Sequence, residues 1–192
     1  ALDLLNRLST NELVEVPAGT GKGTVLTTSK GRVIDLLHLF AREGHLLLLT
    51  SPQTQERIIE WIDFYTFGEE IEVLDVTEST ALFSLLGPEA GPLLQSVWGV
   101  PTEEQEPYSS ATLEVNGVGV TLLRSDPLGE VGFDLVVPAD QAAGVWQAVL
   151  SAGASRGIRP VGQAAFEVRR VEAGLPRFGR ELTEEVNPHE AG

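Results

Sequence analysis

Two segments of this chain, residues 127–138 and 170–182, place charged side chains beside glycines and turns at the end of a predicted element. The first segment, PLGEVGFDLVVP, carries Glu130, and the second, RVEAGLPRFGREL, carries Arg170. A carboxylate accepts paired hydrogen bonds from adjacent donors, and a guanidinium binds carboxylates through a planar fork of donors. Spacing of this kind is more typical of a binding pocket than of a plain core.

The bulk composition limits which classes of protein can hold such a pocket. The chain has 192 residues, of which 42% are hydrophobic, so it can bury a core as one large domain or two small ones. Its formal net charge of −15 argues against general binding of nucleic acid, because that binding depends on Lys and Arg at the phosphates. One alternative stays open, a local basic patch formed by Arg156, Arg159, Arg169 and Arg170.

Other classes are excluded by what the sequence lacks. No apolar run approaches the roughly 20 residues of a membrane-spanning helix, and no signal peptide is visible. The absence of cysteine rules out disulfides, thiolate zinc sites, iron–sulfur ligation and cysteine nucleophiles within this sequence. The three histidines, His38, His45 and His189, are scattered, so we predict no metal site.

The glycine-rich segment PAGTGKGT, residues 17–24, does not fit a phosphate-binding loop. That motif requires a glycine where Val16 stands and a hydroxyl-bearing residue after Lys22, where Gly23 stands. We interpret the segment as a flexible loop between strands.

Hydrophobic periodicity and turn residues predict the elements of the first half of the chain. Ile58, Ile62 and Tyr65 share one face of a helix that ends at Gly68. The predicted elements are a helix at 2–9, a short strand at 14–16, strands at 24–29, 32–41 and 45–51, a helix at 54–67 and a half-buried strand at 71–77.

The second half repeats a similar plan. Asn116-Gly117 is the strongest hairpin signal in the sequence, because both turn residues tolerate positive φ. The predicted elements are a strand at 80–86, a helix between Pro88 and Gly99, hairpin strands at 111–115 and 118–123, a strand at 131–137, helices at 140–152 and 161–172, and irregular chain after that.

This order of elements predicts an α+β fold of two ferredoxin-like units, with antiparallel sheets and helices on one face. We place the first unit at residues 1–78, the second at 79–160, and a closing helix with extended chain at 161–192. The sequence contains no methionine and starts inside a predicted helix. We therefore expect a fragment that lacks N-terminal residues and a C-terminal domain.

Several segments together resemble the folate-binding family that contains the glycine-cleavage T-protein, an aminomethyltransferase, and the YgfZ-type proteins. The similar segments are LNRLSTNEL (5–13), TTSKGRVIDLL (27–37), GEVGFDLVVP (129–138), RVEAGLPRFGREL and the final NPHEAG. KGRV and GLPRFGREL favour the YgfZ branch, and Pro127-Leu128 stands where the T-protein usually carries Tyr-Thr. A cysteine-containing segment expected in the YgfZ branch would follow residue 192.

The resemblance implies a folate-binding, T-protein-like fold and a role for Asp35, which aligns with the T-protein's catalytic aspartate. Asp35 is thus a candidate for catalysis as a general base and for folate binding. From residue type alone, it is a strand aspartate that faces solvent among packed neighbours. The T-protein has two adjacent acidic residues here, whereas this chain has Ile34 before Asp35, which weakens the catalytic interpretation and leaves binding intact.

The resemblance also implies four further folate-binding residues. Glu130 would accept hydrogen bonds from the pterin ring, Phe133 would wall that ring, and Arg170 would bind the carboxylates of the glutamate tail. Arg124, before the Gly-Glu turn, is a further candidate. The structural alternatives are a solvated turn for Glu130, core packing for Phe133 and a helix-dipole contact for Arg170.

The function that the resemblance favours is a tetrahydrofolate-binding protein of YgfZ type, which supports iron–sulfur enzymes or tRNA modification. Its ligand would be tetrahydrofolate or a one-carbon derivative, its partners would include iron–sulfur proteins, and we expect it to be cytoplasmic. One alternative is a tetrahydrofolate-dependent aminomethyltransferase like the T-protein, which Asp35 supports. Another is a non-catalytic scaffold that keeps the fold without the ligand.

Overall fold

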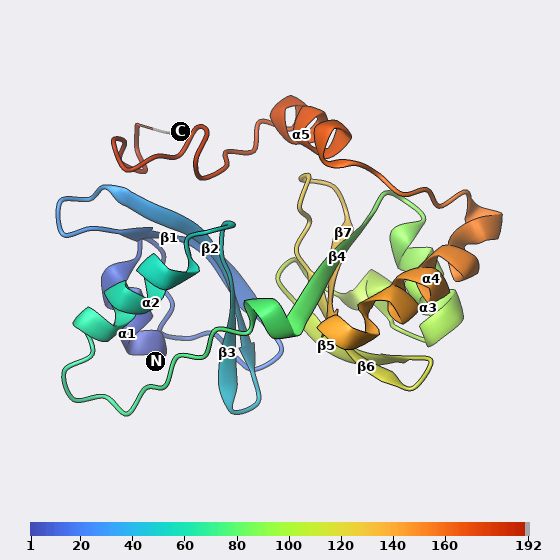
Figure 1. Ribbon diagram of the computed structural model, residues 1–192, viewed down its shortest axis with the longest axis horizontal. Coiled ribbons are helices and arrows are strands. Elements are labelled where there is room, and N and C mark those ends of the chain that lie inside the picture. The colour runs from blue at the N-terminus through green and yellow to red at the C-terminus, as the bar shows by residue number, and fades with distance from the viewer. Residues whose placement is uncertain (191–192) are drawn as a thin grey trace. The chain divides into compact units, whose positions relative to one another are not determined.

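The computed structural model describes residues 1–190, and the chain divides into two compact units (Figure 1). Unit 1 comprises residues 1–75 together with the chain from Pro176 onward, and unit 2 comprises residues 76–175. The first boundary lies three residues before the predicted one. The predicted closing segment, 161–192, is instead divided between the units, and its last two residues lie outside the described part of the chain.

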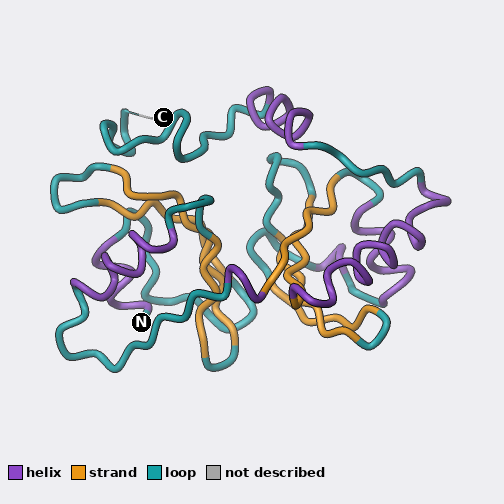
Figure 2. The backbone as a smooth tube through the Cα atoms, in the orientation of Figure 1, coloured by secondary structure: helices purple, strands orange, loops and turns teal. Residues whose placement is uncertain are grey.

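Polar contacts explain why the end of the chain belongs to unit 1. The backbone N–H of Val33 donates to the carbonyl of Val186 over 3.1 Å, and Arg57 forms an ion pair with Glu184. Arg32 donates to the carbonyl of Glu185. Figure 2 shows that this part of the chain runs as loop, as the sequence predicts.

Unit 1 is an antiparallel three-stranded sheet, ordered β1-β2-β3, with two helices packed against it. Leu4 and Ile58, one from each helix, belong to the same buried cluster as Leu37 and Leu39 of the central strand. Both helices lie on one side of the sheet (Figure 1). The elements are α1 (Leu2–Leu8), β1 (Gly21–Thr27), β2 (Val33–Arg42), β3 (His45–Leu49) and α2 (Gln55–Phe64).

A β-bulge interrupts the pairing of β1 with β2. Leu26 pairs with Asp35, and the next residue, Thr27, pairs with Val33, so Ile34 is the extra residue on β2. Ile34 and Asp35 are both completely buried. Bulges redirect side chains locally, and this one explains how two successive strand residues are both enclosed.

Unit 2 is an antiparallel four-stranded sheet in the order β4-β7-β6-β5, with α3 and α4 contributing to one hydrophobic core. Leu94 of α3 and Val145 of α4 pack with Val120 and Leu135 of the sheet. The strands and helices are β4 (Thr80–Leu86), α3 (Ala90–Trp98), β5 (Ser110–Val115), β6 (Val118–Arg124), β7 (Gly132–Pro138), α4 (Ala142–Gly153) and α5 (Gln163–Glu172). Short 3-10 turns cover Thr77–Ser79, Thr102–Glu104, Ala139–Gln141 and Ala154–Arg156.

The α+β class with antiparallel sheets and packed helices is confirmed. The connectivity of unit 2 is β-α-β-β-β-α, so its second helix follows the last strand, whereas a ferredoxin-like repeat places that helix before it. The predicted strands at 14–16 and 71–77 are wrong, since neither segment joins a sheet in the described residues. Val16 packs in the core of unit 1 from a loop, and residues 72–76 are exposed.

Candidate functional site

Asp35 lies on the central strand of unit 1, where its side chain is completely buried. Its Oδ1 accepts a hydrogen bond from the backbone N–H of Leu36 over 2.8 Å. Its Oδ2 accepts from the backbone N–H of Ser51 over 2.8 Å and from the hydroxyl of Thr54 over 2.7 Å. Asp35 is therefore not the solvent-facing strand residue of the structural alternative, because three donors of the protein fix its carboxyl group.

The donors to Asp35 come mainly from the connection between β3 and α2. Ser51 and Thr54 lie in this turn, and Gln53 between them has a positive φ of 69°. The Thr54 hydroxyl also lies 2.8 Å from the carbonyl oxygen of Ser51. A threonine directly before a helix is a typical N-cap, so the sequence offered a partial signal for the place of Thr54. It offered none for the contact with Asp35, which lies 19 residues earlier in the chain.

Glu130 lies in unit 2, on the loop between β6 and β7, with its side chain 63% exposed. It forms an ion pair with Arg169 over 2.9 Å, and Arg169 also binds Glu172 over 3.0 Å. The side chain of Glu130 is thus largely exposed, and one of its oxygens already faces a cation. The sequence indicated Arg169 only as part of a basic patch. Its partner Glu130 lies 39 residues earlier in the sequence.

The loop that carries Glu130 is held by Arg124 and Asp126. The Arg124 guanidinium donates to Asp126 over 3.3 Å and to the carbonyl of Gln105. Asp126 in turn accepts from the backbone N–H of Gly132 over 3.0 Å. A Cβ at Gly132 would lie 2.8 Å from Cδ of Pro127, so this position requires glycine. Arg124 therefore has a structural role in shaping the loop.

Tyr108 lies next to the same loop. Its backbone N–H donates to the carbonyl of Arg124 over 2.8 Å. Burial raises the pKa of the Tyr108 phenol, and the negative charge of Asp126 raises it further. The phenol therefore stays neutral and a hydrogen-bond donor at any pH near neutrality.

Arg170, at the end of α5, is only 6% exposed. Its guanidinium donates to Glu167 over 3.2 and 3.3 Å and to the carbonyl of Leu175. These contacts tie the last turn of the helix to the chain that follows it. Arg170 thus makes its contacts from a buried position, whereas its neighbour Arg169 makes its ion pairs at the surface.

Phe133 lies on β7 with no exposed surface, inside the hydrophobic core of unit 2. In this structure the ring packs as core, which was the structural alternative for this residue. The predicted site residues are thus divided, with Asp35 in unit 1 and Glu130, Phe133, Arg124 and Arg170 in unit 2. Within unit 2, Arg124 ends β6 and Glu130 lies on the loop that follows it.

The basic patch that the sequence left open is largely neutralised. Arg156 binds Glu89 over 2.7 Å, and both Arg169 and Arg170 have carboxylate partners. Among residues 1–190 no cluster of three or more histidine, aspartate or glutamate side chains is placed to hold a metal ion. The helices of the described chain are also too short or too polar to cross a membrane.

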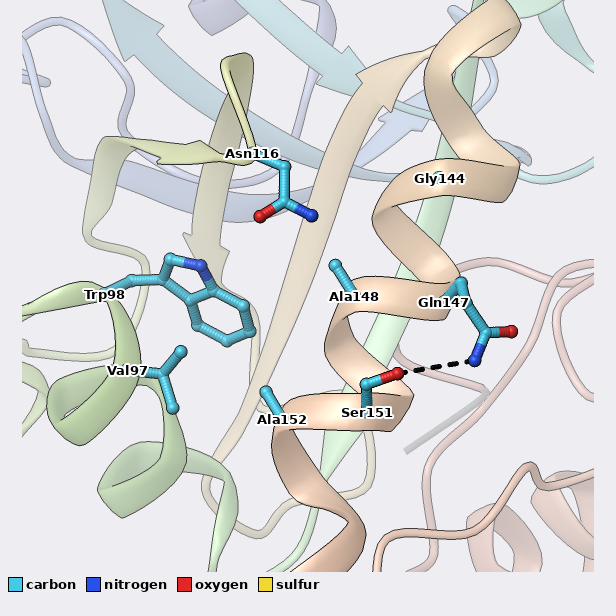
Figure 3. A pocket seen from close by; sticks show the side chains of 8 residues that line it. All are labelled: Val97, Trp98, Asn116, Gly144, Gln147, Ala148, Ser151 and Ala152. Atoms are coloured by element: carbon cyan, nitrogen blue, oxygen red, sulfur yellow. Dashed lines mark hydrogen bonds between the residues drawn. The ribbon is translucent and has the colours of Figure 1, made fainter.

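An open groove of about 510 Å³ lies elsewhere on unit 2. Trp98 and Asn116 lie across it from the small side chains of Ala148 and Ala152 on α4 (Figure 3). None of the predicted site residues lines this groove. Its walls carry no ionisable side chain, so it does not offer acid–base chemistry.

Solved structures identify the class of fold. The glycine cleavage system aminomethyltransferase T from Bartonella henselae superposes with a TM-score of 0.84 over 97% of this chain and 50% of that protein, at 24% identity. The heterotetrameric sarcosine oxidase from Corynebacterium sp. U-96 matches with a TM-score of 0.53 over 76% of this chain and 70% of that chain, at 18% identity. The chain therefore has the aminomethyltransferase T type of fold.

Sequence comparison then shows the family. The model of the GCVT N-terminal domain matches residues 1–192, and the chain belongs to that family. It is 33% identical over its full length to an aminomethyltransferase of Geobacillus kaustophilus and 34% identical to one of Shouchella clausii. In both cases it spans 53% of the relative, so the chain covers about half the length of these proteins.

Proposed function

We propose that this chain is a tetrahydrofolate-binding part of an aminomethyltransferase. The proposal rests mainly on Asp35, a buried carboxyl group with defined hydrogen bonds at the position where the resemblance places the catalytic aspartate. The named relatives, matched along the whole chain, support the aminomethyltransferase alternative better than the YgfZ-type interpretation. Iron–sulfur partners and tRNA modification gain no support from them and are not part of the proposal.

The residues of unit 2 fit the chemistry of a folate in different ways. Tetrahydrofolate presents adjacent N–H donors on its pterin ring, and the exposed carboxylate of Glu130 can accept from them. Its ion pair with Arg169 is no obstacle, because exposed pairs of this kind contribute only about 0–1 kcal/mol. Arg169 is also exposed and suits an anionic group of the ligand.

The other predicted residues do not contact the ligand in this proposal. Arg124 shapes the loop of Glu130, and Arg170 fixes the chain after α5 through Glu167 and Leu175. We propose both as residues that hold the binding surface in place. Phe133 follows this loop on β7 and lies in the hydrophobic core of unit 2.

Calorimetric titration of the chain with tetrahydrofolate and with its 5-formyl derivative tests the proposal. We expect saturable one-to-one binding. Asp35→Asn should abolish aminomethyl transfer by the enzyme while the folate affinity is largely kept. If the folded protein binds neither folate, the proposal is wrong for this chain.

A scaffold without ligand is the second candidate, and one observation favours it. Asp35 accepts hydrogen bonds from three groups of the protein itself, and its side chain has no exposed surface. A scaffold predicts that Asp35→Asn lowers the stability of unit 1 and that there is no folate affinity to lose.

A further inference from the structure

We infer that Thr54 is a positioning residue for Asp35, with a hydroxyl that can serve either protonation state of the carboxyl group. The Thr54 side-chain oxygen lies 2.7 Å from Oδ2 of Asp35 and 2.8 Å from the carbonyl oxygen of Ser51. A hydroxyl has one hydrogen, so it donates to one of these acceptors at a time. This inference rests on the proposed function, in which Asp35 exchanges a proton.

With these two acceptors, the Thr54 hydroxyl can form its hydrogen bonds in two ways. When Asp35 is a carboxylate, Thr54 donates to Oδ2. When Oδ2 carries a proton, that proton is donated to the Thr54 oxygen, and the hydroxyl hydrogen turns to the carbonyl of Ser51. The contact between Asp35 and Thr54 is kept in both states, with its direction reversed.

Burial makes this adaptability valuable. Thr54 is 7% exposed and Asp35 is completely buried, so water cannot readily replace a lost hydrogen bond. A buried donor or acceptor left without a partner costs about 1–3 kcal/mol. Without the Thr54 hydroxyl, one protonation state of Asp35 would carry such a penalty. The backbone donors, Leu36 and Ser51, cannot reverse in this way, because an N–H group only donates.

The local structure fixes the hydroxyl in this position. Thr54 precedes α2, and its carbonyl accepts from the N–H of Ile58 over 3.0 Å, the first bond of the helix. Its β-branched side chain has few χ1 rotamers. On the other side, the bulge at Ile34 sets the orientation of Asp35. Thr54 therefore holds the carboxyl group from an element independent of the strand that carries it.

The test compares Thr54→Val, which removes the hydroxyl at nearly constant shape, with Thr54→Ser, which keeps it. The first readout is the ¹³C resonance of the Asp35 carboxyl carbon in aspartate-labelled protein, assigned by its loss in Asp35→Asn. We expect Thr54→Val to displace this resonance and Thr54→Ser to restore it. Thr54→Ala is a second variant without hydroxyl, in case valine disturbs the turn.

The second readout is aminomethyl transfer to tetrahydrofolate. We expect Thr54→Val to lower kcat about tenfold with little change in KM, which corresponds to one charge-assisted hydrogen bond, and Thr54→Ser to recover most of it. If Thr54 had only a structural role, its replacement by valine would lower stability without lowering kcat selectively over KM. An unmoved Asp35 resonance in folded Thr54→Val and Thr54→Ala overturns the inference.

The two proposals fail separately. If wild-type protein neither binds nor uses tetrahydrofolate, the proposed function fails, while the carboxyl resonance still decides whether Thr54 acts on Asp35. If folate binds and turnover depends on Asp35 but Thr54→Val turns over like wild type, only the role of Thr54 is wrong.

Discussion

Two carboxylates that the sequence singles out, Asp35 in unit 1 and Glu130 in unit 2, are held in opposite ways. Asp35 is enclosed and accepts hydrogen bonds from two backbone N–H groups and a hydroxyl. Glu130 is 63% exposed and meets the side chain of Arg169. Donors within the fold fix the first group, whereas the second meets one exposed side chain. Changes at Asp35 should therefore affect stability and function together, and changes at Glu130 should affect function alone.

The largest effect on stability is expected at Phe133, in the core of unit 2. Phe133→Ala should lower the free energy of unfolding by about 3–5 kcal/mol, because it opens a cavity at a completely buried ring. Urea denaturation measures this change. Phe64→Ala, at a ring that is 66% exposed, is the control and should cost clearly less. A near-neutral Phe133→Ala with lost folate affinity would instead favour the predicted pterin wall.

At Asp35 we expect the next largest effect. Asp35→Ala leaves the N–H groups of Leu36 and Ser51 without their acceptor, while the Thr54 hydroxyl can still donate to the carbonyl of Ser51, and the change should cost about 2–3 kcal/mol. Chemical denaturation of Asp35→Ala beside Asp63→Ala, an exposed aspartate on α2, isolates the effect of burial. Equal losses in the two variants would contradict the description of Asp35 as fixed by the fold.

Two adjacent arginines of α5 also differ in burial, since Arg170 is buried and Arg169 is exposed. Arg170→Ala removes a buried guanidinium from Glu167 and the carbonyl of Leu175 and should cost about 1–3 kcal/mol. Arg169→Ala removes an exposed ion pair and should cost less than about 1 kcal/mol. Thermal unfolding of the two variants measures the difference. A larger loss for Arg169→Ala would reverse the assignment of their roles.

Glu130→Gln should separate function from stability. We expect its free energy of unfolding to stay within about 1 kcal/mol of wild type, because the ion pair with Arg169 is exposed. Its tetrahydrofolate affinity should fall about tenfold through loss of a charge-assisted contact. Glu114→Gln, at an exposed residue on β5, is the matched control for calorimetry and should bind like wild type. Unchanged affinity in Glu130→Gln would remove this residue from the proposed site.

The sequence predicted well those features that depend on local chemistry. Asn116-Gly117 has the positive φ values that its hairpin requires, 52° and 82°, and the flanking strands formed as predicted. The alternation in residues 71–77 was misleading, because a strand also needs a neighbour, and no local pattern supplies one.

The surroundings of the site residues depend on contacts that are remote in sequence. Asp35 meets Thr54 across 19 residues, and Glu130 meets Arg169 across 39. The resemblance singled out Asp35 and Glu130 as candidates. Only the folded structure shows their partners, and that Asp35 is buried whereas Glu130 is exposed.

The smallest effect concerns Glu69, a partly exposed carboxylate that has backbone donors, as Asp35 does. The backbone N–H groups of Gly68, Glu69 and Phe67 and the guanidinium of Arg7 lower its pKa from 4.5 to about 2. Because the folded protein has the lower pKa, this contribution to stability is present above about pH 4.5 and is lost as the pH falls towards 2. Glu69→Gln should thus be slightly less stable than wild type at pH 7, and this difference in stability should narrow in acid.

Urea denaturation at pH 7 and pH 3 measures the difference, with Glu70→Gln as the control for loss of a neighbouring negative charge. A constant gap would mean that the backbone donors do not favour the ionised form of Glu69, and that exposure, rather than the type of donor, separates Asp35 from Glu130.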